Sequence, residues 1–379
     1  MTKEETLALI RKYNARQCTE EETALLESWY VTQDKQYHQE VPEAVIDEIL
    51  EQIHLALPRP RKVAPLWKKV AVAATSLLML SAGFYYGNRL SDHNSALHPH
   101  YAADAAPGGN RATLTLASGK VIDLNAAVHG KLTEQAGISV SKTASGQLVY
   151  QVSGADPINK NPIFNTLNTP KGGTYLVVLP DQSRVWLNAA SQLVFPLRFS
   201  ERERRVELKG EAYFEISKDT DHPFVVSTAR QDIKVLGTHF TVNAYEDEPG
   251  TKTTLIEGSV QVTAKGDEQK YLVLKPNQQS LLTTDFRVKQ VNAGSENAWI
   301  NGKFIFDDEP LESILRKVAR WYDIKVVYHD DAVRQLAFGG TMSRFSKVSK
   351  VLGKLEATGD VHFELERSGT QYQLTVYKK

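Results

Sequence analysis

Hydrophobic and polar positions follow different spacings along this chain. Apolar residues recur every three or four positions from residue 1 to 57, which is typical of helices, and alternate in short runs from 111 to 295, which is typical of strands. Residues 296–379 mix the two patterns, and a continuous apolar run precedes the alternating region. The predicted fold class is therefore multidomain: an all-α N-terminal segment, one transmembrane helix, an all-β domain of stacked strands and a small C-terminal α+β domain.

The apolar run extends from Val70 to Asn88 and contains no charged residue. As a helix with a rise of about 1.5 Å per residue, it matches the ~30 Å hydrocarbon core of a bilayer. Residues 58–69 are basic and contain no acid, whereas Arg89 alone follows the run before Asp92. This asymmetry predicts a single-pass protein of the inner membrane with a cytoplasmic N-terminus. A buried core helix is the alternative.

The segment 1–57 predicts short helices. A capping box formed by Thr19 and Glu22 begins one of them, and Pro42 is placed to begin another. The segment has five basic residues against twelve acidic ones, so its surface favours a basic partner rather than nucleic acid. It forms either a small self-contained bundle or a bundle whose apolar stripe is completed by a partner helix.

Residues 89–110 are polar, contain Pro and Gly, and are predicted to be a linker. Its residues His93, His98 and His100 are interpreted as solvated side chains, so no metal or other cofactor is expected. Cys18 is the only cysteine, which excludes a disulfide or a two-cysteine metal site within one chain.

The alternating region 111–295 begins with an internal repeat. Residues 116–127 (LASGKVIDLNAA) align without gaps on residues 179–190 (LPDQSRVWLNAA). Each copy is an apolar run, a polar turn and a second apolar run, which is the pattern of a β-hairpin. Further strands separated by Gly and Pro predict an all-β stack, with Gly210, Gly237 and Gly258 at strand ends.

Several ordered motifs in this region resemble the core of FecR-type anti-sigma factors. They are residues 210–216 (GEAYFEI), 223–226 (PFVV), 235–245 (VLGTHFTVNAY) and 255–260 (LIEGSV). Residues 169–173 (TPKGG) and 185–191 (VWLNAAS) are similar to the lead-in of Bacteroidota members. The N-terminal segment also resembles the family's anti-sigma helix, and the matching residues are Glu21, Glu22, Leu25, Leu26, Trp29 and Tyr30.

Residues 296–379 predict strands at 303–306, 324–328, 361–366 and 371–377, with amphipathic helices at 310–321 and 346–355. This order is similar to the short domain that ends Bacteroidota FecR-type proteins and to the signalling domains of secretins and TonB-dependent receptors. Asp307, Asp308 and Glu309 are interpreted as acids that favour the start of the first helix.

The resemblance implies an anti-sigma factor that sequesters an extracytoplasmic-function (ECF) sigma factor in the cytoplasm. The implied periplasmic partner is the signalling domain of an outer-membrane TonB-dependent transporter, and an intramembrane protease would release the signal. The alternative function is a membrane-anchored envelope protein whose β domain binds glycan or another envelope component.

The usual catalytic and nucleotide-binding fingerprints are absent from the sequence, so no enzyme is expected. One bond is an exception to consider, because in some FecR-type proteins the matching Gly-Thr pair is a self-cleavage point. Here it is Gly237-Thr238, where the Thr238 hydroxyl would attack the Gly237 carbonyl with the help of a nearby base. A turn glycine followed by a strand threonine is the other interpretation.

Overall fold

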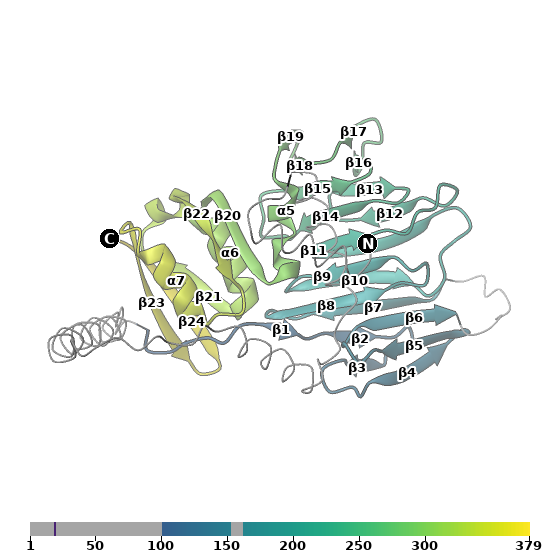
Figure 1. The fold of residues 1–379 in the computed structure, drawn as a ribbon, viewed down its shortest axis with the longest axis horizontal. Coiled ribbons are helices and arrows are strands. Elements are labelled where there is room, and N and C mark those ends of the chain that lie inside the picture. Colours follow the sequence, from purple (N-terminus) through teal and green to yellow (C-terminus); the bar gives the residue numbers. More distant parts are fainter. Residues whose placement is uncertain (1–18, 20–100, 153–161) are drawn as a thin grey trace, which may run out of the picture. The chain divides into compact units, whose positions relative to one another are not determined.

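The computed structural model describes Thr19, residues 101–152 and residues 162–379 of the 379-residue chain. The described residues from Tyr101 onward belong to one compact unit. It contains a stack of strands over residues 109–290, the β-stack, and an α+β part over residues 303–378, the C-terminal module (Figure 1).

The internal repeat forms two hairpins with the same turn. In one, β2 (Thr113–Thr115) pairs with β3 (Val121–Asp123); in the other, β8 (Gly173–Val178) pairs with β9 (Arg184–Leu187). The backbone N–H of Leu116 donates to Lys120, and the N–H of Leu179 donates to Ser183 at the same place in the second copy. The predicted hairpins are confirmed in both copies.

The β-stack consists of two sheets that share one strand. The first sheet runs in the order β3, β2, β7 (Phe164–Thr169), β10 (Ser191–Pro196), β11 (Arg204–Glu215), β12 (Phe224–Ser227), β13 (Gln231–Val235), β16 (Val260–Ala264) and β17 (Tyr271–Leu274). The second runs in the order β4 (Gly130–Gln135), β5 (Ile138–Lys142), β6 (Leu148–Val152), β8, β9, β11, β14 (His239–Ala244), β15 (Thr251–Glu257), β18 (Gln278–Leu282) and β19 (Phe286–Gln290). β1 (Gly109–Asn110) pairs in parallel with β8.

Strand β11 passes from one sheet to the other at Gly210. Its first half pairs with β10 and β12, and its second half pairs with β9 and β14. Gly210 has a φ of 85°, and a Cβ there would lie 2.4 Å from the hydroxyl oxygen of Ser191. A side chain is therefore excluded at the crossing by conformation and by space.

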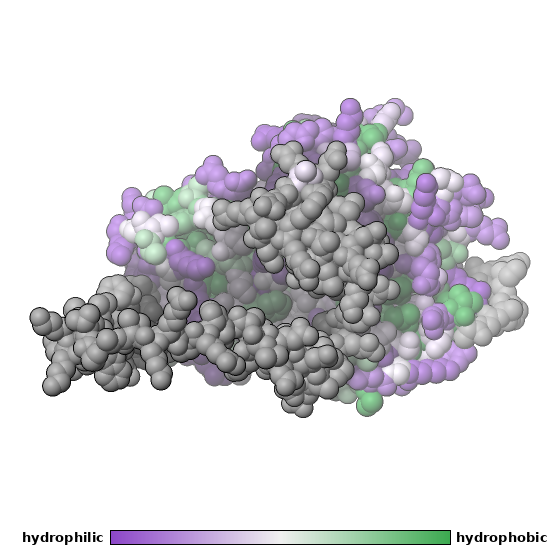
Figure 2. All heavy atoms as spheres, in the orientation of Figure 1, coloured by the Kyte–Doolittle hydropathy of each residue, from purple (hydrophilic) through white to green (hydrophobic). Residues whose placement is uncertain are grey.

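Alternating side chains from the two sheets form the core of the β-stack. Along β8, for example, every second residue is buried. Phe214 and Phe240 are fully buried and stack with their ring centroids 5.0 Å apart. On the face shown in Figure 2, the visible described surface is mostly hydrophilic, with apolar residues in small groups.

The C-terminal module follows the short helices α5 (Ala293–Glu296) and η1 (Ala298–Asn301). Its elements are β20 (Lys303–Pro310), α6 (Leu311–Tyr322), β21 (Ile324–Tyr328), η2 (Asp331–Gln335), β22 (Ala337–Ser343), α7 (Val348–Glu356), β23 (Val361–Ser368) and β24 (Gln371–Lys378). One sheet has the order β21-β24-β23, and β20 pairs with β22. The acids 307–309 belong to β20 rather than to the start of a helix.

The predicted fold class was wrong. The described residues form mostly strands, and their α-helices are the short α5, α6 and α7. No helix in the described part of the chain has the length and hydrophobicity needed to cross a bilayer. Apart from Thr19, the expected helical segment 1–57 lies outside the described residues, as does the apolar run Val70–Asn88. The prediction assigned the fold class a large helical share, whereas strands dominate the described residues.

The end of the expected linker is packed rather than free. Residues 101–105, called the strap below, lie against the C-terminal module, where Ala105 is 1% exposed and part of the core. Gly108 then passes Trp321 so closely that a Cβ would lie 2.8 Å from the indole ring. The chain reaches the β-stack only at β1.

Candidate functional site

The junction between the β-stack and the C-terminal module is built around Arg320, near the C-terminus of α6. Its side chain is 8% exposed, and its guanidinium lies 3.9 Å from the centre of the Tyr245 ring. One end of the guanidinium donates to both Asp247 oxygens at 2.8 and 2.9 Å, and the other donates to Glu248. The two acceptor residues and Tyr245 follow β14, so these contacts connect helix α6 to the β-stack.

Glu248 is the buried acid of this cluster, because its side chain is only 3% exposed. Arg316, one helical turn before Arg320, also pairs with Glu248 at 3.0 Å. Burial alone would lower the pKa of Arg320, but Tyr245, Asp247 and Glu248 outweigh it, so the net pKa shift is upward. Arg320 therefore stays charged, and the two arginines neutralise an acid that would otherwise be costly to bury.

Arg344 supplies a second buried cation at the junction. It is 2% exposed, and its guanidinium lies 3.9 Å from the centre of the Trp321 ring. It donates to the Trp299 carbonyl at 3.0 Å and to the side-chain oxygen of Asn188 at 2.9 Å. Burial lowers the pKa of Arg344 to about 10. Its positive charge is thus stabilised by the Trp299 carbonyl, the Asn188 amide and the face of the Trp321 ring.

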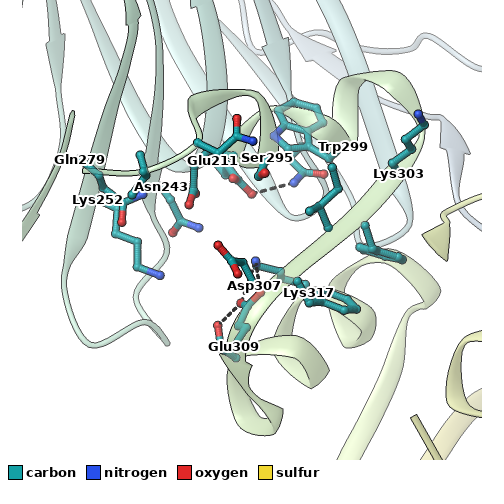
Figure 3. Close-up of a pocket in the computed structure, with 18 of the residues that line it drawn as sticks. Glu211, Asn243, Lys252, Gln279, Ser295, Trp299, Lys303, Asp307, Glu309 and Lys317 are labelled. Atoms are coloured by element: carbon teal, nitrogen blue, oxygen red, sulfur yellow. Dashed lines mark hydrogen bonds and ion pairs between the residues drawn. The ribbon is translucent and has the colours of Figure 1, made fainter. Parts of the chain in front are cut away.

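A polar pocket of about 290 Å³ opens between the two parts. The side from the β-stack includes Glu211, Asn243, Lys252 and Gln279, and the opposite side includes Trp299, Lys303, Asp307, Glu309 and Lys317 (Figure 3). Acids and bases alternate around this pocket, so its lining provides both hydrogen-bond donors and acceptors.

Glu211 is the pocket acid whose pKa is raised. Burial raises its pKa, although the hydrogen bond from Asn188 and the charges of Lys317 and Arg320 act in the opposite direction. Its carboxylate accepts from the Asn188 amide at 2.7 Å. Because Asn188 also accepts from Arg344, Glu211 and Arg344 are linked through one amide side chain.

Lys317 is paired within the C-terminal module. Its ammonium lies 2.7 Å from a Glu309 oxygen, and Glu309 also accepts from the Ser313 hydroxyl at 2.6 Å. Glu309, at the end of β20, therefore binds side chains of the first turns of α6. Glu309 therefore supports this helix through side-chain contacts, although it is not helical itself.

The junction is suited to binding and to electrostatic coupling rather than to nucleophilic catalysis. Among the described residues, no group of three or more His, Cys, Asp or Glu side chains is placed to hold a metal ion. The strongest interactions here join Arg320 and Arg344 of the C-terminal module to groups of the β-stack. A ligand or partner that moves the C-terminal module must act on these contacts.

The predicted self-cleavage pair lies between β13 and β14, away from this junction. Gly237 has a φ of 152°, and a Cβ there would lie 2.7 Å from the Lys218 Cα atom. Thr238 is 4% exposed, and its hydroxyl donates to the Ser259 carbonyl at 3.1 Å. His239 pairs instead with Glu257 at 3.4 Å. The hydroxyl of the nucleophile candidate thus binds a backbone carbonyl, and cleavage stays a prediction.

The predicted sigma-binding residues are not tested by the structure. They are Glu21, Glu22, Leu25, Leu26, Trp29 and Tyr30, and all lie outside the described residues. Sequence reasoning did not identify Arg320, Glu248, Arg344 or Glu211 as site residues. The Arg320 and Glu248 positions are 72 residues apart, and nothing local in the sequence links them.

Comparisons with known proteins identify two family domains in the chain. Residues 165–261 match the family described as FecR protein, and residues 303–372 match the family described as FecR, C-terminal. The first lies within the β-stack and the second within the C-terminal module. A search of curated proteins gave no significant match.

Two solved structures from Parabacteroides distasonis resemble the chain, and both are described as a "putative anti-sigma factor". The structure at 1.65 Å resolution shares 27% sequence identity, with a TM-score of 0.52 over 56% of this chain and 99% of that one. The structure at 2.50 Å shares 26% identity, with a TM-score of 0.52 over 57% of this chain and 99% of that one. With both FecR domains in order and this structural likeness, the chain is similar to the FecR-type anti-sigma factors.

Proposed function

We propose that this protein binds an ECF sigma factor through residues 1–57 and receives the controlling signal at its C-terminal module. The single observation that carries the proposal is the likeness to the P. distasonis protein over 99% of that chain, together with the two FecR domains. The family is regulatory, and the proposed role is binding rather than catalysis.

The N-terminal segment would act by covering a surface that the sigma factor needs for RNA polymerase. Its twelve acidic residues against five basic ones suit a basic partner, and the apolar Leu25, Leu26 and Trp29 would supply the buried centre of the contact. The acidic Glu21 and Glu22 would then direct association through long-range attraction.

A pull-down with the full chain tests this part. The bait is the full protein, and the prey is a purified ECF sigma factor from the source organism. Substitution Trp29→Ala should lower recovery at least tenfold, because a buried aromatic anchor contributes about 2 kcal/mol or more to an interface. Lys35→Ala in the same segment is the control and should bind normally. Equal recovery with both variants, or no sigma factor with the wild type, contradicts the proposal.

The proposed source of the signal is the signalling domain of a TonB-dependent transporter. The C-terminal module offers a three-stranded sheet with two edges, β21 and β23, and strand addition at an edge is a common mode of recognition. Placement of residues 1–57 and 101–379 on opposite sides of the inner membrane stays a prediction from the sequence. A compartment reporter fused after Arg89 tests it, and a protease in signal release is tested separately by following chain length after induction.

A further inference from the structure

The strap is attached to the C-terminal module by contacts with α7. Asp104 accepts from the backbone N–H of Ser349 at 3.1 Å and from its hydroxyl at 2.8 Å. The carbonyl of Ala105 accepts from the N–H of Val348 at 3.1 Å. Lys347, the residue at the N-cap of α7, makes no side-chain cap of its own. The strap therefore caps a helix that lies 245 residues further along the chain.

The same segment also occupies one point on the edge of β23. Tyr101 forms an isolated parallel bridge with Leu365. Its hydroxyl donates to Glu356 at 3.1 Å, and Glu356 also contacts a ring nitrogen of His362. Glu356 is 5% exposed at the end of α7. Tyr101 thus contacts both the edge strand and the helix that packs beside it.

The β23 edge is longer than the part that the strap covers. β23 has eight residues and pairs along its whole length with β24 on its inner side. On its outer side, the described residues contribute the single bridge at Leu365. An edge strand offers a row of backbone donors and acceptors to any extended segment. The strap meets this edge at Tyr101, and the net stabilisation from each hydrogen bond is modest.

We propose that the edge of β23 is the docking site for an extended strand of a partner protein, which binds by displacing the strap. This rests on the proposed function, in which a partner signals through the C-terminal module. An added strand would make a ladder of backbone hydrogen bonds in place of one bridge. Glu356, Glu364 and Glu366 near the edge favour a strand with hydroxyl or basic side chains.

Displacement of the strap would carry the signal toward the N-terminal segment. The strap is the first described stretch of the compact unit, and it is the covalent connection between the preceding residues of the chain and the following described ones. When the strap leaves α7 and β23, the preceding residues lose this attachment to the C-terminal module. Gly108 and β1 still attach the following residues to the β-stack. The partner therefore needs no contact with the sigma-binding residues.

Hydrogen exchange on the purified full chain tests the strap directly. We expect local opening to expose the backbone amides of the strap and of its binding site, which are residues 102–105, Val348 and Ser349. These amides should therefore exchange faster than the amides of β24. Asp104→Ala should speed their exchange at least tenfold. Asp330→Ala is the matched control, since Asp330 caps η2 in the same module by accepting from Ala332 at 2.8 Å. Exchange of the strap only through global unfolding would overturn the proposal.

A labelled peptide of residues 101–107 (YAADAAP) serves as the probe for an incoming strand. The substitutions Tyr101→Cys and Leu365→Cys, in a Cys18→Ser background, form a disulfide that locks the strap when oxidised. The peptide should bind the Asp104→Ala chain at least tenfold more tightly than the locked chain, and reduction should restore binding. The peptide AAAAAAP is the control.

Equal binding to the locked and Asp104→Ala chains would refute the docking edge. A dimer of the Asp104→Ala chain that excludes the peptide would refute the assignment to a partner protein and indicate a second copy instead. Both readouts are independent of the sigma factor, so failure of the sigma-factor pull-down would leave them interpretable.

Discussion

Arg320 and Glu248 form an ion pair between α6 and the β-stack in which the side chains are 8% and 3% exposed. Arg316 pairs with the same carboxylate, so one buried acid is neutralised by two arginines from a single helix. These charges must remain together, because Glu248 separated from both arginines would be a buried charge without a partner. The ion pair therefore makes the position of the C-terminal module sensitive to any change that separates them.

Loss of the Glu248 charge should destabilise the protein. Glu248→Gln preserves the size of the side chain but leaves Arg320 and Arg316 without their buried partner, which should lower the free energy of unfolding by about 3 kcal/mol. Urea denaturation followed by tryptophan fluorescence measures this. Asp247→Asn is the control, since the Asp247 side chain is 58% exposed and its loss should have an effect below about 1 kcal/mol. Equal effects from both variants would contradict the assignment.

The close passage of Gly108 predicts contrasting effects for two neighbouring glycines. A Cβ at Gly108 would lie 2.5 Å from the Gly172 carbonyl oxygen and 2.8 Å from Trp321, whereas a Cβ at Gly109 meets nothing within 4 Å. Gly108→Ala should therefore lower the free energy of unfolding by about 1–3 kcal/mol through overpacking. Gly109→Ala should change it by less than about 1 kcal/mol. Thermal unfolding of the two variants side by side is the measurement, and similar melting temperatures would refute the packing argument.

Glu211 should make stability depend on pH. Burial raises its pKa in the folded state above the reference value of 4.5. At pH values between the reference pKa and the raised pKa, the folded state therefore retains the proton that the unfolded state has lost. Stability then falls as the pH rises through that window, and the ionised form is destabilising above it. Glu211→Gln should raise the melting temperature relative to wild type at neutral pH and have less effect below the reference pKa.

The control for Glu211 is Glu207→Gln, an exposed acid on the same strand. It should show no comparable dependence on pH. If Glu211→Gln lowers the melting temperature more at neutral pH than in acid, then the attraction of Lys317 and Arg320 dominates and the expected sign is wrong.

Cleavage at Gly237-Thr238 can be settled on a denaturing gel. If the bond is cleaved, the wild type gives two fragments that join at 237/238, Thr238→Ala gives one full-length band, and Thr238→Ser retains cleavage because it keeps a hydroxyl nucleophile. A single full-length band from the wild type rules the reaction out. The Thr238 hydroxyl must leave its bond to Ser259 before it can attack.

Much of the strand and helix content follows from local patterns. Alternation in residues 175–179 indicated the strand that the structure places at 173–178 as β8, and spacing by three and four indicated α6 and α7, because each of these elements buries one face. The predicted strand 324–328 coincides with β21. Burial of a regular face leaves a period in the sequence, and that period is visible without a structure.

Two features of the fold left no such period. The residues on either side of Gly210 were predicted as two strands, but Gly210 lets one strand of twelve residues continue from the first sheet into the second. The strap was predicted as part of a linker from the polar, Pro- and Gly-containing composition of residues 89–110. Its five residues, of which only Ala105 is deeply buried, are too few to form a periodic pattern. A short segment that binds a distant surface has no repeat from which it can be recognised.

The candidate site was the least predictable part. The arrangement of Arg320 and its partners depends on how α6 packs against the β14–β15 connection. Arg344 contacts Asn188 across 156 positions of sequence. Charged residues at such positions look like ordinary surface residues in the sequence. The resemblance of the motifs to the FecR family was informative about class, but it did not indicate which side chains join the two parts.

The separation between Asp104 and Ser349 also affects how the protein is made. The ribosome adds Asp104 245 residues before Ser349, an interval of roughly 12 to 50 seconds at ~5–20 residues per second. During that time the β-stack can begin to fold while the strap still lacks its binding surface. Nascent chains and products that stop before α7 therefore carry a strap without its binding surface. The synthesis of α7 determines when the strap can first bind.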